Sequence, residues 1–106
     1  MDIKWIKECV RENAYFLSGH ADEERMDENL TILEIEEALI SGRILEDYPD
    51  DRRGESCLVV GFTNSGIPIH VVCGRREDGF VIITVYIPSP PKFKTPYERG
   101  RIRRKK

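Results

Sequence analysis

Apolar residues recur along this chain with two different periods, and the change of period separates a helical half from a strand half. Between Ile3 and Leu17 the apolar positions fall at 3, 6, 10, 14 and 17, which is the spacing of one helix face. A second apolar stripe follows Thr31, which forms a capping-box pattern with Glu34 three residues later. That stripe ends at Gly42, a common helix stop. We therefore expect two amphipathic helices in the first part of the chain.

The second half contains short runs of β-branched and aromatic residues separated by turn signals, a pattern typical of an antiparallel meander. Four runs are expected to be strands, at residues 43–48, 56–62, 67–73 and 80–87. Together the elements predict an α+β domain, with two N-terminal helices packed on one face of a four-stranded antiparallel sheet.

Side-chain alternation predicts the two faces of this sheet, because neighbouring residues of a strand point to opposite sides. The unbroken apolar row of the last strand is expected to face the core: Val81, Ile83, Val85 and Ile87. Strand pairing, with a two-residue turn at residues 65–66, extends this core to Ile69, Val71, Cys73, Leu58, Val60 and Phe62. The opposite face then carries His70, Thr84 and Tyr86 together, beside Gly61.

Composition and charge limit what the chain is expected to be. With 106 residues, of which 40% are apolar and 34% charged, it fits one small domain, assigned to residues 1–91. We find no secretory leader and no bilayer-spanning run, so a cytoplasmic protein without a membrane partner is expected. The three cysteines lack metal-type spacing and sit among apolar neighbours, which indicates buried thiols. No cofactor and no metal site are predicted.

Charge is unevenly distributed along the chain. Residues 1–91 contain 18 acidic and 9 basic side chains, whereas residues 92–106 contain 1 acidic and 8 basic ones. The second segment is expected to be a basic, flexible C-terminal tail. It is interpreted either as a nucleic-acid arm or as a solubilising terminus that neutralises the acidic body. The arginines of the arm would be Arg99, Arg101, Arg103 and Arg104.

Several short motifs carry a resemblance to a known family: His20-x-x-x-Glu24-Arg25, Ile35-Glu36-Glu37-Ala38-Leu39, Gly42-x-Ile44-Leu45-Glu46-Asp47-Tyr48-Pro49, Gly61-x5-Ile67-Pro68-Ile69-His70-Val71-Val72 and Ile83-Thr84-Val85-Tyr86. The chain resembles, over residues 15–93, a bacterial and archaeal family of small domains of unknown function grouped with the RelE-like toxins. Those toxins belong to the barnase, colicin and RelE superfamily of metal-independent ribonucleases. The resemblance implies a RelE-like fold, an active site on the open face of the sheet, and a small zinc-finger protein of antitoxin type as a partner.

RNA cleavage without a metal needs a base, an acid and cations that stabilise charge on phosphorus. The candidates for acid and base are His20, His70, Glu24 and Tyr86. The candidates for substrate binding are Arg25, Arg52, Arg53 and Thr84. The sequence predicts a toxin-type ribonuclease acting on RNA if these side chains converge on one face.

Each candidate also has a structural explanation. His20 fits a position beside a helix end, and His70 fits a hydrogen bond to Thr84 or Tyr86 across the sheet. The acidic body also repels phosphate. The alternative function is therefore a non-catalytic module that binds a protein or a nucleic acid through its open sheet face and basic tail. Two sheet edges leave homodimerisation open.

Overall fold

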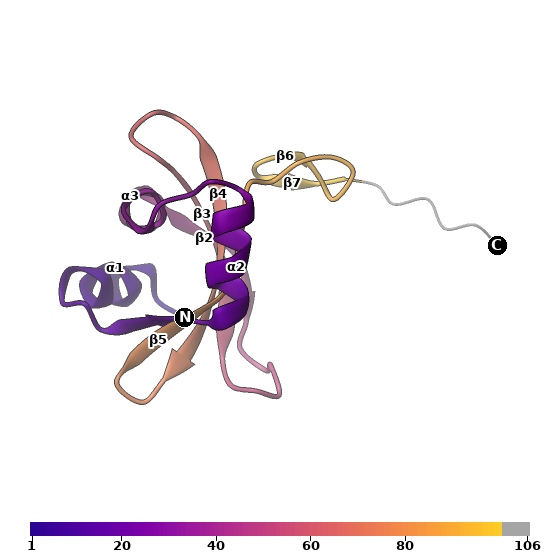
Figure 1. The fold of residues 1–106 in the computed structure, drawn as a ribbon. Coiled ribbons are helices and arrows are strands. Elements are labelled where there is room, and N and C mark those ends of the chain that lie inside the picture. The colour runs from indigo at the N-terminus through magenta and orange to yellow at the C-terminus, as the bar shows by residue number, and fades with distance from the viewer. Residues whose placement is uncertain (101–106) are drawn as a thin grey trace.

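The computed structural model describes residues 1–100, which form three helices, a five-stranded sheet and a small C-terminal hairpin (Figure 1). The N-terminal elements are α1 (Ile3–Arg11), β1 (Tyr15–Leu17), α2 (Gly19–Asp27) and α3 (Ile32–Ser41). They are followed by β2 (Arg43–Tyr48), β3 (Ser56–Phe62), β4 (Pro68–Arg76), β5 (Gly79–Tyr86), β6 (Phe93–Thr95) and β7 (Glu98–Arg99). None of the helices in residues 1–100 is both long and apolar enough to cross a bilayer.

The sheet has the strand order β1-β5-β4-β3-β2, and its last four strands are the predicted antiparallel meander. The α+β class is confirmed. The prediction of a four-stranded, purely antiparallel sheet is wrong, because β1 adds a fifth strand that pairs in parallel with Phe80–Ile82. The RelE-like character of the fold stays a prediction.

Strand β1 was not predicted, because the apolar residues at positions 14 and 17 continue the helical spacing of α1. The helix ends at Arg11, and Asn13 adopts a left-handed conformation with φ of 56° that reverses the chain. Tyr15 then stacks on Phe80 with ring centroids 5.5 Å apart, and its hydroxyl donates a hydrogen bond to Glu36. These contacts fix residues 15–17 as a strand rather than a last helical turn.

Helix α2 is the second element that the hydrophobic pattern does not reveal. Ala21 is its one buried residue, so it carries no apolar stripe. The helical spacing predicted from the sequence runs up to Leu17, but the next residue, Ser18, is the N-cap of α2, and its hydroxyl accepts a hydrogen bond from the Ala21 backbone at 3.0 Å. The same hydroxyl donates to the Ile83 carbonyl at 3.1 Å, which ties the start of α2 to β5.

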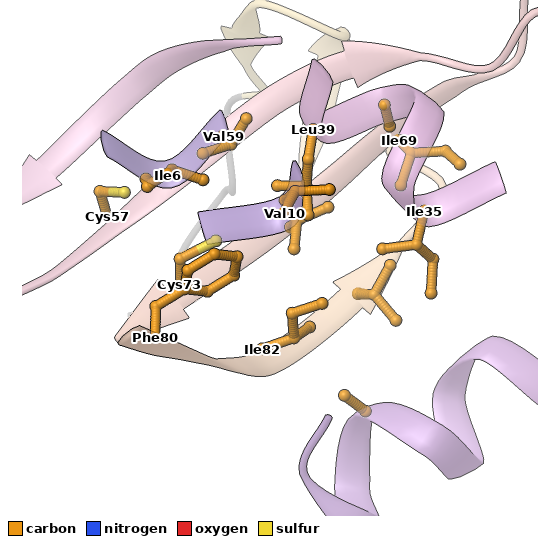
Figure 2. Packing of buried hydrophobic residues seen from close by; sticks show 14 of the residues in the cluster. Ile6, Val10, Ile35, Leu39, Cys57, Val59, Ile69, Cys73, Phe80 and Ile82 are labelled. Carbon is orange, nitrogen blue, oxygen red and sulfur yellow. The ribbon is translucent and has the colours of Figure 1, made fainter. Parts of the chain in front are cut away.

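The core lies between the sheet and the two helices α1 and α3, which cover one face (Figures 1 and 2). The helices contribute Ile6 and Val10 from α1 and Ile35 and Leu39 from α3, all buried. From the sheet come Cys57, Val59, Ile69, Val71, Cys73, Phe80, Ile82 and Val85. We call this the helix face of the sheet, and the opposite side the second face.

The predicted faces are correct for β4 and wrong for β3 and half of β5. In β5 the register shifts between the pairs Val72↔Thr84 and Cys73↔Ile82, so a bulge reverses the alternation and turns Phe80 and Ile82 into the core. Consequently Val81 and Ile83 are only half-buried. In β3 the register pairs Gly61 with Ile69, so Cys57 and Val59, rather than Leu58, Val60 and Phe62, reach the core.

Close packing of α3 on β3 gives a stability prediction. A Cβ atom at Gly61 would lie 1.7 Å from the Ala38 carbonyl oxygen, whereas one at Gly19 would meet nothing within 4 Å. Gly61→Ala should therefore lower the free energy of unfolding by about 1–3 kcal/mol or more, and Gly19→Ala should change it by less than about 1 kcal/mol. Urea denaturation of both variants measures this. Equal midpoints would contradict the packing.

Candidate functional site

The edge of β5 positions the candidate site. β1 pairs only with Phe80–Ile82, so the rest of this edge needs other partners for its backbone amides. Helix α2 supplies them: Glu24 Oε1 accepts from the Val85 amide at 3.1 Å, and Glu28 Oε1 accepts from the Ile87 amide at 3.5 Å. The helix is thereby held along the end of β5, with its polar side chains beside the second face of the sheet.

A cleft of about 390 Å³ lies between α2, the end of β5 and the following C-terminal segment. Its lining includes four of the predicted site residues, His20, Glu24, Thr84 and Tyr86. The remaining lining residues are Glu28, Ile87, Ser89, Lys92 and Phe93. The structure thus brings together one imidazole, two carboxylates, two hydroxyls of β5 and one ammonium group.

His20 and Glu24 form a pair on one face of α2, four residues apart. His20 Nε2 lies 3.3 Å from Glu24 Oε1, and the His20 side chain is 66% exposed. An imidazole that donates from Nε2 to this carboxylate keeps Nδ1 as a free acceptor. The pair therefore offers the cleft a solvent-accessible base with a carboxylate beside it.

Tyr86 and Lys92 form the opposite side of the cleft. The Lys92 ammonium lies 5.6 Å from the centroid of the Tyr86 ring, within the range of a cation–π contact. Burial raises the pKa of Tyr86 above its ordinary value of 10.0, so its phenol keeps its proton near neutral pH. The cleft therefore holds a proton-bearing hydroxyl and a cation within reach of one another.

His70 lies behind Tyr86 rather than in the cleft wall. Its side chain is 0% exposed, its Nε2 lies 2.6 Å from the Pro96 carbonyl, and its Nδ1 lies 3.2 Å from the Tyr86 hydroxyl. Because a carbonyl only accepts, Nε2 carries the hydrogen and Nδ1 accepts from Tyr86. His70 thus holds the Tyr86 phenol from behind and does not itself line the cleft.

The C-terminal segment lies at one end of the sheet, on the side opposite α1 and α3, and its hairpin of β6 and β7 stands out from there (Figure 1). Phe93 packs edge-on against His70, with ring centroids 4.4 Å apart, and Arg99 lies 4.8 Å above the Phe93 ring. Arg99 also donates two hydrogen bonds of 2.7 Å to the Glu46 carboxylate. The sequence predicted an open face and a tail beginning at residue 92. In the described residues the segment up to Gly100 packs on the sheet and supplies Ser89 and Lys92 to the cleft.

Lys92 and Ser89 were not indicated by sequence patterns, because both lie in a segment that is rich in proline and charge. The one signal was Phe93, an aromatic residue inside an otherwise basic stretch. A buried aromatic anchor of this kind brings its neighbours onto the surface of the sheet, which is how Lys92 reaches the cleft.

The remaining predicted residues lie outside the cleft. Arg25 contacts the Asp22 carboxylate at 2.7 Å and the Leu30 carbonyl at 3.3 Å, so it stabilises the end of α2. Arg52 and Arg53 lie in the loop between β2 and β3. Arg99 binds Glu46, and the other arginines of the predicted arm, Arg101, Arg103 and Arg104, lie outside the described residues.

Cysteines and carboxylates form no further centre in the part of the chain that the structure describes. Cys9, Cys57 and Cys73 are free and buried, as the sequence indicated. No group of three or more His, Cys, Asp or Glu side chains within residues 1–100 is arranged to hold a metal ion.

Comparison with known proteins identifies one family. The model of a family described as a domain of unknown function (DUF4258) matches residues 17–87. The matched part begins at the end of β1 and closes just after β5, so it contains α2 and the β5 half of the cleft but not Lys92. Neither a curated protein nor a solved structure matches the chain.

Burial of His70 predicts a pH dependence of stability. Burial lowers its pKa below the ordinary 6.5, so as pH falls through 6.5 the unfolded chain takes up a proton that the folded chain does not. The free energy of unfolding should therefore decrease as pH drops from about 7.5 to about 5.5. His70→Phe should be less stable overall and should show a smaller decrease, measured by urea denaturation at both pH values.

The control for this experiment is His20→Gln, which removes the exposed imidazole of the cleft. It should retain the decrease seen in the wild-type protein. An equal decrease in wild type and His70→Phe would show that His70 is not the titrating group.

Proposed function

The chain belongs to the DUF4258 family of domains of unknown function, and we propose from the geometry of its cleft that it cleaves RNA by metal-independent acid–base catalysis. The protein would be a ribonuclease of the RelE-like toxin type, inhibited by a small zinc-finger protein of antitoxin type. The observation that carries the proposal is the convergence of His20, Glu24 and Tyr86 with Lys92 in one cleft. These groups supply a base, its orienting carboxylate, a proton donor and a cation.

The proposed reaction begins at His20. Its free Nδ1 takes the proton of the RNA 2′-hydroxyl, and the 2′-oxygen attacks the adjacent phosphorus. Glu24, 3.3 Å from Nε2, stabilises the imidazolium that forms. Lys92 stabilises the negative charge that accumulates on the phosphate oxygens.

Bond cleavage requires a proton for the departing 5′-oxygen. The Tyr86 hydroxyl turns from His70 toward this oxygen and donates its proton, while the P–O5′ bond breaks. The products are a 2′,3′-cyclic phosphate and a free 5′-hydroxyl. The proton taken up by His20 then returns to Tyr86 through solvent, which restores the starting state of both residues.

The two carboxylates of the cleft oppose phosphate binding less than their formal charge implies. Glu24 and Glu28 each accept a hydrogen bond from a backbone amide of the β5 edge, which disperses part of their negative charge. Lys92 stands across the cleft from them. This balance supports binding of a single phosphate group rather than broad electrostatic attraction of RNA.

The same contacts favour a second candidate function. Because Glu24 and Glu28 hold the β5 edge, the cleft residues also fit a purely structural role, with the protein acting as a non-catalytic binding module. The substitution Glu24→Gln distinguishes a catalytic role of this residue from a structural one. Glutamine retains an acceptor oxygen for the Val85 amide but loses the negative charge.

Substitutions in the cleft test the proposal. His20→Gln and Glu24→Gln should each lower the rate of RNA cleavage by roughly 10²–10⁴-fold. Folding should be preserved, since His20 is exposed and a glutamine in place of Glu24 still accepts from the Val85 amide. The matched control Glu23→Gln changes an exposed residue of the same helix and should leave the rate unchanged. The measurement is cleavage of a fluorescent RNA in the presence of a chelator, with denaturation curves for each variant.

Two outcomes would contradict the ribonuclease. Cleavage that persists in His20→Gln would exclude this residue as the base. RNA binding without cleavage by the wild-type protein would favour the binding module.

A further inference from the structure

Part of the second face carries a surface that the cleft does not use. The helices α1 and α3 cover the other face, and the C-terminal segment covers the second face near His70. Farther along β4 and β5, Val72, Val81 and Ile83 are only half-buried. Their side chains form a narrow apolar strip that starts beside Thr84, which lines the cleft and pairs with Val72.

Two arginines stand at the far end of this strip. Arg53 and Arg76 line a small cavity of about 90 Å³, together with Asp51, Gly54, Gly74 and Ile83. The Arg53 side chain is 88% exposed. Arg76 Nη1 donates one hydrogen bond to the Arg75 carbonyl at 2.7 Å. Several guanidinium N–H groups therefore remain for a ligand, in a geometry that suits phosphate oxygens.

Glycine keeps this end of the strip open. A Cβ at Gly74 would lie 2.8 Å from Ile83 Cδ1 and 3.3 Å from Arg76 Nη1. A larger residue would displace Ile83 or Arg76, both of which line the cavity. The glycine thus preserves the space between the two arginines.

Asp51, the one acidic wall of the cavity, is engaged elsewhere. Its Oδ2 accepts from the Ser56 hydroxyl at 2.9 Å, and its Oδ1 accepts from the Arg53 backbone amide at 3.1 Å. The Arg53 guanidinium is at the limit of an ion pair with it, 3.9 Å away, and surface pairs of this kind are weak. Asp51 therefore shapes the loop without neutralising Arg53.

We propose that a single RNA strand leaves the cleft along this strip and that Arg53 and Arg76 grip one of its phosphates. The inference rests on the proposed function, since it assigns the path of the same substrate. From His70, behind the cleft, to Gly74 is four residues of β4, or roughly 13 Å, a span that a short oligonucleotide covers. The cations at the two ends suit the phosphates of a strand, and the apolar side chains between them offer a surface on which the faces of its bases can pack.

The test is binding of an uncleavable RNA that carries 2′-O-methyl groups, measured by fluorescence anisotropy with a dinucleotide and with an oligonucleotide that spans more than roughly 13 Å. Wild-type protein should bind the longer one more tightly. The double variant Arg53→Ala/Arg76→Ala should lose roughly 10- to 100-fold in affinity for the longer one only, and the slope of log K against log salt should fall by about 0.7.

The matched control is Arg11→Ala, which removes an exposed arginine from α1, on the helix face, and should bind both RNAs like wild type. Unchanged affinity of the double variant for the longer RNA would overturn the inference while cleavage, and with it the proposed function, stands. Length-dependent binding without cleavage would overturn the proposed function and leave the path intact. Equal binding of an oligo-glutamate peptide through the same arginines would overturn the assignment to RNA.

Discussion

The unpaired edge of β5 is the constraint on which the rest of this structure depends. A strand edge with free backbone amides needs partners, and this one uses two in succession, a three-residue parallel strand and then two carboxylates of α2. Because side chains of α2 take up the hydrogen bonds of this edge, polar groups lie where a further strand would otherwise pair with β5. The candidate cleft exists because α2, rather than another strand, closes this edge.

The second determinant is the C-terminal segment, which completes the cleft from the opposite side. Its attachment combines a buried edge-on contact between Phe93 and His70 with the bidentate pair between Arg99 and Glu46 on the far strand β2. Phe93 lines the cleft beside Lys92, and the Arg99–Glu46 pair holds the same segment from outside the cleft, so both contacts help to fix Lys92 and the Tyr86 hydroxyl. His70 illustrates the consequence: a histidine enclosed by the segment influences the site through the groups that it holds, not by contact with solvent.

Prediction from the sequence succeeded where the periodic pattern was long and failed where tertiary contacts decided. The meander, the capped helix α3 and the face of β4 follow from alternation and capping signals. β1 and α2 do not, because β1 has only three residues and α2 buries only Ala21. A bulge at Ile83 reversed half of β5, and no local signal marks it. Thr84 and Tyr86 nevertheless share the predicted face, because that face depends on the part of β5 beyond the bulge. His20 and Glu24 reach the same cleft through α2, which the pattern did not reveal, and Arg25 and His70 do not line it.

Glu24 contacts two different groups at once, one on the sheet and one on its own helix. Its carboxylate satisfies the Val85 amide and contacts His20 through the same oxygen. The Glu24 carboxylate therefore interacts with both the β5 edge and the His20 imidazole, whereas the backbone amide of the edge requires only a hydrogen-bond acceptor. Glutamine would serve the backbone equally well and would leave His20 without a counter-charge. A carboxylate at this point is therefore more than the hydrogen bond to the Val85 amide requires, and its negative charge lies against the imidazole of His20.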